Sequence, residues 1–510
     1  MRKHHRQDDW TDYFCGSGGS STGLTAIKGA TVRVAANHWK LAVETHGVNH
    51  PTTDHLCADI SQYDPRRLPR TRFAWFSPSC TNHSGAKGKK RDYQGDLFEE
   101  YVPDEAADRS RATMWDVPRF SEFHGYDYVI VENVVEAALW NQWPAWLMAM
   151  ECEGYTYRVV YLNSMHATNG GPGAPQSRDR MYVVFWKKGL PAPDFAKWTR
   201  PMAYCPSCDE HVRAVQAWKN PEKMWGRYNR QYVWRCPNFK CRNEQVYPAV
   251  SPAASVIDFT LPGQRIGDRD KPLSDKTMTR IEHGLGRAWE SMLVPVEGRD
   301  GKAPASTADP MRTLTTRAET GLAMVPFIAE LRGGGSTSRP VTDPLATFTA
   351  SGFHHGLTIP PGFLMRQNGT TGNLAWASTP FDEPMRTLTT KGQQAVVTMP
   401  WAGVYGYDSG QVRSTAEVLP TQTTVDGDAL LHGVAPLTER PAVEDCLFRM
   451  LVTREIKGGM AFPDEYVILG NKREQAKLLG NAVTPPNSRD LGAMVMEAAN
   501  GSPVEFETAA

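Results

Sequence analysis

Short apolar runs alternate with amphipathic stretches along the first third of the chain. Runs such as VRVAA, RFAWF, YDYVIV and MYVVFW have the length of buried strands, whereas WKLAVETHG spaces its apolar residues as a helix does. Strands that alternate with helices in this way build βα units around a largely parallel sheet. Residues 11–186 therefore predict a doubly wound α/β domain.

After about residue 187, Pro, Gly and Thr break the pattern into short β-prone segments and loops. Four related segments place a Thr-rich run between two turn signals, and they begin at Asp309, Asp343, Glu383 and Glu417. Helical spacing returns from Asn471 onward. We therefore expect a second, β-rich region between the α/β domain and the C-terminal helices.

The composition is that of a globular protein, with 40% hydrophobic and 22% charged residues. No apolar run approaches the roughly 18 residues of a membrane span, and the first residues lack the apolar core of a secretory signal. We expect a cytoplasmic protein without a membrane partner. Lys plus Arg and Asp plus Glu both number 56, so any nucleic-acid site has to be local.

Two candidate sites follow predicted strands. The segment DYFCGSGG, residues 12–19, places glycines between a strand and a helix, which suits either a nucleotide-like ligand or a merely structural turn. Cys80 ends another strand and precedes a loop with four basic residues. A thiol with a lowered pKa is a nucleophile, so Cys80 is a catalytic candidate, with inert packing as the alternative.

Two more candidates flank apolar strands. Glu132 ends the strand VIVENV, where a carboxylate is costly unless it is paired, so we expect either a functional site or a structural ion pair. Gln176, Arg178 and Arg180 precede the strand MYVVFW. Residues two apart on an extended segment face the same side, so both guanidinium groups could approach one ligand or form a solvated edge.

In order and spacing, these motifs resemble the DNA (cytosine-5)-methyltransferase family. That family reads DxFxGxGG, a Cys-bearing loop, ENV, QxRxR, a variable region, RxLTxRE with a following FP, and GNAVxP. This chain supplies DYFCGSGG, SPSCTNHS, ENV, QSRDR, RMLVTRE with Phe462 and Pro463, and GNAVTP. The resemblance implies a Rossmann-like S-adenosylmethionine-dependent methyltransferase domain formed by residues 1–186 and 446–498, with a tail at 499–510.

The resemblance also implies a covalent reaction on a cytosine flipped out of duplex DNA. Cys80 would attack carbon 6, so that carbon 5 can take the methyl group of S-adenosylmethionine. Glu132 would hold and protonate ring nitrogen 3, Arg178 would bond the carbonyl at position 2, and Arg180 would support these residues.

For the cofactor, the resemblance assigns six residues to the S-adenosylmethionine pocket: Phe14, Gly16, Gly18, Trp39, Asp59 and Asn481. The last of these implies that the C-terminal helices belong to the N-terminal domain. The chain departs from the family pattern in three places. Ser79 and Thr81 flank Cys80 in place of Pro and Gln, His38 stands where many members carry a Glu that binds the ribose, and Cys15 stands where a small residue is common.

The variable region, residues 187–445, contains two Cys pairs, namely Cys205, Cys208, Cys236 and Cys241. Their spacing predicts a structural zinc ribbon over residues 203–245, with unliganded thiols as the alternative. Residues 205–250 carry eight Lys and Arg against four Asp and Glu and interleave them with aromatic residues. This mixture suits either nucleic-acid contacts or a small aromatic core, built from Trp218, Trp225, Tyr228, Tyr232 and Trp234.

We therefore expect a two-lobed enzyme that acts as a monomer on duplex DNA in a bacterial or phage-infected cell, with a long target-recognition region. Its Thr-rich repeats, residues 306–433, would be mainly a β scaffold that contacts DNA through turn residues Arg312, Arg317, Arg386 and Lys391. Two alternatives stay open. One is the family's tRNA-methylating branch, which has a short variable region, and the other is a catalytically silent, zinc-containing DNA-binding protein.

Overall fold

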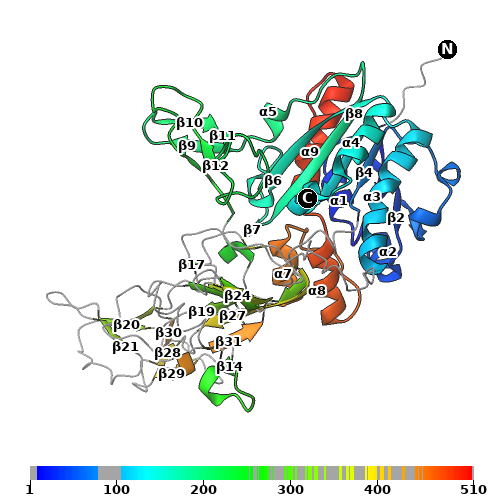
Figure 1. Cartoon of the computed structure of the whole chain (residues 1–510). Coiled ribbons are helices and arrows are strands. Elements are labelled where there is room, and N and C mark those ends of the chain that lie inside the picture. The colour runs from blue at the N-terminus through cyan, green and yellow to red at the C-terminus, as the bar shows by residue number, and fades with distance from the viewer. Residues whose placement is uncertain are drawn as a thin grey trace, which may run out of the picture. The chain divides into compact units, whose positions relative to one another are not determined.

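The computed structural model consists of two compact units, unit 1 (residues 1–251 and 457–510) and unit 2 (residues 252–456) (Figure 1). The structure describes the backbone of residues 8–78, 105–251 and 452–507, and separate elements between 253 and 450. Side chains are described mainly in 8–78, 113–251 and 452–507. Among the helices in these parts of the chain, none combines the length and hydropathy that a bilayer crossing requires.

Unit 1 is built on a seven-stranded mixed sheet. Its strands are β1 (Asp9–Tyr13), β2 (Thr31–Asn37), β3 (Asp54–Cys57), β4 (Phe73–Phe76), β5 (Tyr128–Asn133), β6 (Tyr155–Asn163) and β8 (Asp179–Lys187). The short β7 (Gln176–Ser177) precedes β8 in the chain and is not one of these seven strands. The order is β3-β2-β1-β4-β5-β8-β6. In this spatial order, the neighbouring strands β3, β2, β1, β4 and β5 are all parallel. Strand β8 is antiparallel to both β5 and β6. The sheet confirms the predicted α/β fold class.

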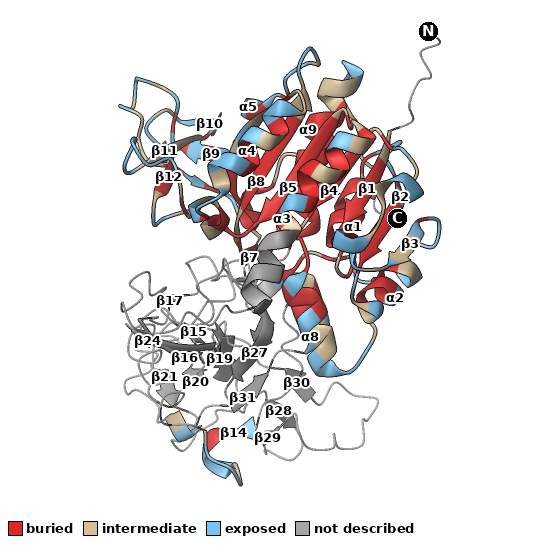
Figure 2. Ribbon diagram, turned by 45° about the vertical axis from the view of Figure 1, so that its right-hand side comes forward, coloured by how far each residue is buried: buried red, intermediate tan, exposed pale blue. Residues whose placement is uncertain are grey.

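Helices cover both faces of this sheet, as Figures 1 and 2 show. The described α-helices are α1 (Gly19–Thr25), α2 (Lys40–Asn49), α3 (Glu105–His124), α4 (Trp143–Cys152), α5 (Phe195–Trp198), α7 (Thr453–Gly459), α8 (Lys472–Asn481) and α9 (Pro485–Asn500). Strand β4 explains the layering, because successive side chains of a strand point to opposite faces. Phe73 and Trp75 belong to the apolar cluster that includes α1 and α9, and Ala74 and Phe76 belong to the one that includes α3 and α4.

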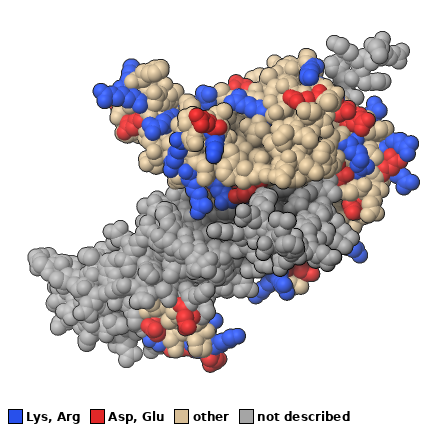
Figure 3. All heavy atoms as spheres, in the orientation of Figure 1, with Lys and Arg blue, Asp and Glu red and all other residues tan. Residues whose placement is uncertain are grey.

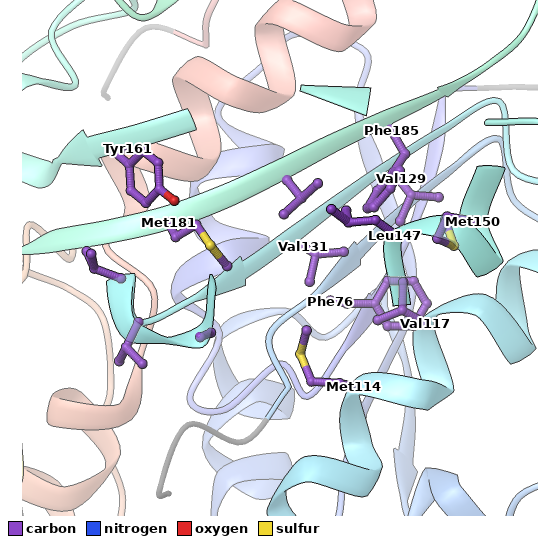
Figure 4. Packing of buried hydrophobic residues seen from close by; sticks show 14 of the residues in the cluster. Phe76, Met114, Val117, Val129, Val131, Leu147, Met150, Tyr161, Met181 and Phe185 are labelled. Atoms are coloured by element: carbon purple, nitrogen blue, oxygen red, sulfur yellow. The ribbon is translucent and has the colours of Figure 1, made fainter. Parts of the chain in front are cut away.

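The α3–α4 face is shown from close by in Figure 4. Met114 and Val117 of α3 and Met150 of α4 lie around Phe76 of β4 and Val131 of β5, and all five side chains are buried. An apolar strand covered on both faces needs no polar alternation, which is why RFAWF and YDYVIV are continuous apolar runs.

The C-terminal helix α9 packs directly against α1, near the N-terminus of the chain. Two glycines of α1 allow this approach. A Cβ on Gly19 would lie 1.9 Å from the Val483 carbonyl oxygen, and one on Gly23 would lie 2.1 Å from the Pro485 carbonyl oxygen. The glycine-rich motif therefore serves helix packing as well as the turn after β1.

Residues 202–248 form a small module within unit 1, here called the four-cysteine module because it contains both Cys pairs. Strands β10 (Glu210–Arg213), β9 (Met202–Cys205) and β13 (Tyr247–Pro248) form one sheet, and β11 (Val215–Trp218) pairs with β12 (Tyr232–Arg235). The sequence suggested that this segment is part of the target-recognition region. In the structure it lies in the same compact unit as the seven-stranded sheet.

The described elements of unit 2 are mainly strands. The largest sheet contains β14 (Gln264–Arg265), β15 (Met292–Pro295), β17 (Ala305–Ser306), β18 (Thr316–Ala318), β19 (Thr320–Ala323), β23 (Phe363–Arg366), β27 (Thr389–Thr398) and β31 (Leu447–Met450). Smaller sheets contain β16 (Glu297–Gly301), β20 (Phe327–Glu330), β21 (Ser338–Pro340), β22 (His355–Thr358), β24 (Asn368–Gly372), β28 (Gly403–Gly406), β29 (Val412–Ser414) and β30 (Asp428–Leu430), and β26 spans Met385–Arg386. The side chains of Arg312, Arg317, Arg386 and Lys391 lie outside the described residues.

Candidate active site

The candidate residues of unit 1 lie at one edge of the sheet. Phe14 follows β1, Trp39 follows β2 and Asp59 comes shortly after β3, and these three parallel strands are neighbours. Glu132 lies at the carboxyl end of β5, beside the start of the antiparallel β8, which begins at Asp179 and carries Arg180 as its second residue. Open α/β sheets bind ligands beyond the carboxyl ends of their parallel strands. The topology thus brings Phe14, Trp39, Asp59, Glu132 and Arg180 to the edge of the sheet where a ligand is expected.

The turn after β1 has a backbone conformation that few side chains tolerate. Phe14, Gly16 and Gly18 have φ values of 59°, 54° and 95°, all in the left-handed region. A Cβ on Gly16 would meet no described atom within 4 Å, whereas one on Gly18 would lie 2.3 Å from the Tyr466 hydroxyl oxygen. That hydroxyl donates to the Ser17 carbonyl at 2.6 Å. The turn therefore leaves open space beside Gly16. Beside Gly18 it is fixed by Tyr466 of the C-terminal segment.

Asp12, the first residue of the motif, is a buried carboxylate in the strand before this turn. Its Oδ2 accepts hydrogen bonds from Ser20 Oγ at 2.6 Å and Ser21 Oγ at 2.7 Å. Burial raises the pKa of Asp12 from 3.8 to about 6, although both hydroxyl bonds favour the charged form. These bonds join β1 to the first turn of α1. No role was predicted for the Asp12 carboxylate from the sequence. The one signal was its position inside a predicted strand.

Trp39, Asp59 and Asn481 differ in their contacts. The Trp39 backbone N–H donates to Asn37 Oδ1 at 2.9 Å, and Lys477 Nζ of α8 lies 4.5 Å from the centre of a Trp39 ring. Asp59 Oδ1 accepts the backbone N–H two residues further on at 3.0 Å and remains exposed. Asn481, the last residue of α8, is exposed. The Lys477 contact was not anticipated, because no local pattern connects α8 with the end of β2.

Glu132 and Arg180 form an ion pair, with Arg180 Nε 2.8 Å from Glu132 Oε1. Glu132 is 8% exposed and the side chain of Arg180 is 13% exposed. A charge this far from water is costly without a partner, and the pairing offsets part of that cost for both groups. The ion pair lies at the sheet edge where a ligand is expected. The sequence left open whether Glu132 belongs to a functional site or to a structural ion pair, and its position is compatible with both.

Arg178 makes a different set of contacts from Arg180. Its Nη1 donates to the Gly480 carbonyl at 3.2 Å and its Nη2 donates to the Ala482 carbonyl at 2.9 Å. The residue is only 2% exposed. The structure therefore brings Arg180 together with Glu132 and connects Arg178 to the GNAVTP motif.

Cys80 lies outside the described residues, as do its neighbours Ser79 and Thr81. The described chain reaches Pro78, whose carbonyl accepts a hydrogen bond from Asn133 Nδ2 at 3.3 Å. Asn133 thus connects the start of the Cys80 loop to β5, directly beside Glu132.

The two Cys pairs of the four-cysteine module converge. Their sulfur atoms all lie within 4.8 Å of one another, and Cys208 Sγ lies 4.0 Å from Cys236 Sγ. Sulfur atoms around a tetrahedral zinc with bonds of about 2.3 Å are about 3.8 Å apart. The donor set and its spacing therefore fit a zinc ion.

The backbone around these cysteines also fits a metal site. Asp209 and Arg242 directly follow the second Cys of each pair and have φ values of 54° and 55°, so both Cys-bearing turns close in the left-handed region. The Asn238 backbone N–H donates to Cys236 Sγ at 3.5 Å. Such N–H···S bonds orient and stabilise thiolates that bind a metal.

The aromatic residues of the four-cysteine module are mainly core residues. Tyr232 and Trp234 are 0% and 1% exposed. Three others are partly buried against the same apolar cluster, namely Trp218, Trp225 and Tyr228. The structure thus favours the small aromatic core over nucleic-acid stacking for these five side chains.

Sequence comparison matches residues 9–234 to the family model described as C-5 cytosine-specific DNA methylase. No curated protein matches the chain.

Several solved structures resemble the chain at low sequence identity. The Entamoeba histolytica methyltransferase EhMeth is 10% identical, with 98% of this chain and 99% of that chain covered and a TM-score of 0.44. The S. pombe Dnmt2 methyltransferase is 12% identical, with 97% and 98% covered and a TM-score of 0.43. A putative DNA modification methyltransferase encoded within an E. coli prophage is 13% identical, with 96% and 99% covered and a TM-score of 0.40.

Proposed function

Because residues 9–234 belong to the family of C-5 cytosine-specific DNA methylases, we propose that this chain methylates carbon 5 of cytosine in duplex DNA. One observation carries the proposal beyond the family match. The Glu132–Arg180 ion pair lies at the ligand-binding edge of the sheet, and Asn133 connects that edge to the loop that bears Cys80.

In the proposed reaction, the Cys80 thiolate forms a bond to carbon 6 of a flipped-out cytosine. Glu132 donates a proton to ring nitrogen 3, and the negative charge that develops on the ring is thereby neutralised. We assign the contact with the carbonyl at position 2 to Arg180 and not to Arg178. Arg180 is the guanidinium beside Glu132, whereas Arg178 binds the Gly480 and Ala482 carbonyls.

S-adenosylmethionine, when bound, supplies the methyl group that carbon 5 takes up. The open backbone at Gly16, the left-handed turn at Phe14 and the side chains of Trp39 and Asp59 would hold it, with Asn481 at the far side. Water would then take the carbon 5 proton, and the electron pair of that bond would restore the double bond between carbons 5 and 6 as the carbon 6–sulfur bond breaks. Ring nitrogen 3 would return its proton to Glu132, and Cys80 would leave as the thiolate.

We propose that the four-cysteine module holds one structural Zn²⁺ through Cys205, Cys208, Cys236 and Cys241. The site has four protein sulfur donors and so leaves no open position for catalysis by the metal. Its contribution would be to stabilise a module whose strands are short.

Unit 2 is assigned to target recognition. A variable region of this length favours duplex DNA over tRNA, because the tRNA-methylating branch of the family has a short one. The enzyme would act as a monomer in the cytoplasm of a bacterial or phage-infected cell.

Methyl transfer from labelled S-adenosylmethionine to duplex DNA and to tRNA, measured side by side, tests the proposal. We expect labelled duplex DNA, and a covalent adduct on duplexes that contain 5-fluorocytosine. Cys80→Ser should abolish both signals, since its hydroxyl is a far weaker nucleophile than a thiolate. Cys57→Ser, at an exposed free cysteine, is the matched control and should retain both.

Each rival predicts a different result in this experiment. Labelling of tRNA alone would assign the chain to the tRNA-methylating branch. Binding of duplex DNA without transfer or adduct would identify a silent DNA-binding protein. Full transfer by Cys80→Ser would exclude the covalent mechanism.

A further inference from the structure

The four-cysteine module contacts the chain immediately after Glu132. Trp225 Nε1 donates to the Val135 carbonyl at 2.9 Å, and Arg227 forms an ion pair with Glu136. Val135 and Glu136 begin the 3-10 helix that directly follows the ENV motif. Trp225 and Arg227 of the module therefore fix the segment of chain that follows Glu132, the proposed catalytic carboxylate.

A second contact reaches the residue between the two arginines of QSRDR. The Tyr228 backbone N–H donates to Asp179 Oδ1 at 3.0 Å. Arg180 Nη1 in turn donates to the Asp179 backbone carbonyl at 3.1 Å, while its Nε is 2.8 Å from Glu132. The position of Asp179 therefore sets where the Arg180 guanidinium meets Glu132.

The same part of the module is connected to the cysteines. Trp234 lies on β12, two residues before Cys236, and its Nε1 donates to His166 Nδ1 at 3.1 Å. The His166 ring also makes an edge contact with the Tyr228 ring, with ring centres 4.6 Å apart. An ion held by Cys236 would therefore stabilise the strand that keeps Tyr228 against the sheet.

Together these contacts connect the module to both members of the ion pair. Arg227 pairs with Glu136, shortly after Glu132, and Tyr228 binds Asp179, directly before Arg180. We propose that the four-cysteine module positions the catalytic ion pair, with Arg227 as the positioning residue on the module side. The proposal rests on the methyltransferase function proposed above. It gives the metal-bearing module a role in the rate of methyl transfer, in addition to any contact with nucleic acid.

The physical reason is the geometric demand of the reaction. Arg180 has a long side chain, and its guanidinium has to meet both Glu132 and the cytosine ring. A misplacement of about 1 Å costs on the order of a hundredfold in rate, even when the change lies away from the reacting atoms. Arg227 touches neither reacting group, so its loss should alter the rate and leave substrate binding nearly unchanged.

Arg227→Gln tests the proposal, with Arg227→Lys as the conservative variant. Arg66→Gln is the control, because it breaks a solvent-exposed ion pair with Asp64 elsewhere in unit 1. We expect Arg227→Gln to lower kcat and the rate of 5-fluorocytosine adduct formation by on the order of 10–100-fold, with KM and the Kd for DNA within about twofold. Arg227→Lys should recover part of the rate, and Arg66→Gln should equal the parent chain.

Hydrogen exchange gives a readout that does not depend on activity. In Arg227→Gln, and in the parent chain after zinc chelation, peptides covering residues 128–139 and 176–187 should exchange faster, while those covering β1 should not change. This separates the two proposals, because a parent chain without methyl transfer refutes the function whatever the exchange shows. Unchanged exchange and an unchanged adduct rate in Arg227→Gln would overturn the positioning role, as would a loss confined to KM or Kd.

Discussion

The central sheet and the four-cysteine module achieve stability by different means. Every residue of β5 is buried, and its side chains enter two apolar clusters that also include helices from both faces. In β9 only alternate residues are buried, and in β11 none is fully buried. A module with so small a core needs an added link, either a metal ion or docking to a larger domain. Here the structure shows the docking contacts, and its four clustered cysteine sulfurs could hold the metal ion.

Figure 3 adds a difference in surface charge. Lys and Arg side chains gather at the outer end of the four-cysteine module, whereas on the part of unit 1 that covers the sheet, basic and acidic side chains are mixed in this view. The module thus has an apolar, charge-paired inner side toward the sheet and a more basic outer end. Its inner side is where we expect changes to affect catalysis.

The largest effect should come from a change in the sheet that alters chemistry without altering the fold. Glu132→Gln removes the proton donor for ring nitrogen 3, so we expect methyl transfer to fall on the order of 10²–10⁴-fold in single-turnover assays. The amide oxygen of Gln can still accept the Arg180 bond, but the Arg180 charge loses its counter-ion, so the thermal midpoint should fall while the chain remains folded. Glu151→Gln, at an exposed position on α4, is the control. Retention of activity within about tenfold would refute the role of Glu132.

Cys236→Ser should have the next largest effect, and the loss of stability should be greatest within the module itself. Replacing a direct sulfur ligand should weaken zinc affinity by more than the roughly 10–100-fold that is typical of losing a residue that only orients a ligand. We expect proteolysis within residues 202–248 at a concentration of protease that leaves the sheet intact. Metal analysis and limited proteolysis measure this.

Cys152→Ser is the matched control for that experiment, because Cys152 is an exposed free cysteine at the end of α4. A Cys236→Ser protein that keeps its zinc would show that Cys236 is not a required ligand, and one that loses zinc but resists protease as the parent does would show that the module needs no metal.

The sheet was predictable from the sequence, because its strands carry their own signal. The run YDYVIVEN is apolar up to Glu132, and β5 spans Tyr128–Asn133. The different contacts of Arg178 and Arg180 were not predictable, because a spacing of two residues places both side chains on the same side of the strand. What separates them is contact with Gly480 and Ala482, some three hundred residues away. Docking of the four-cysteine module was hidden for the same reason, since the spacing of its cysteines indicates a metal but not a neighbour.

The smallest effect concerns stability within the sheet and its dependence on pH. Burial raises the pKa of Asp12 from 3.8 to about 6, so between these values the folded chain binds more protons at this site than the unfolded chain does. The contribution of Asp12 to the free energy of unfolding therefore falls as pH rises from about 4 to about 6, by on the order of 1–3 kcal/mol. Asp12→Asn cannot titrate, so its stability relative to the parent should rise over that interval and stay level above it. Urea unfolding at pH 4, 5, 6 and 7 measures the difference, in which titrations common to both proteins largely cancel.

Ser20→Ala removes a hydrogen bond that favours the charged form of Asp12 and should steepen the fall in stability with pH that the parent shows. A difference between Asp12→Asn and the parent that does not vary with pH would show that the carboxylate at the start of the glycine-rich motif carries no such penalty.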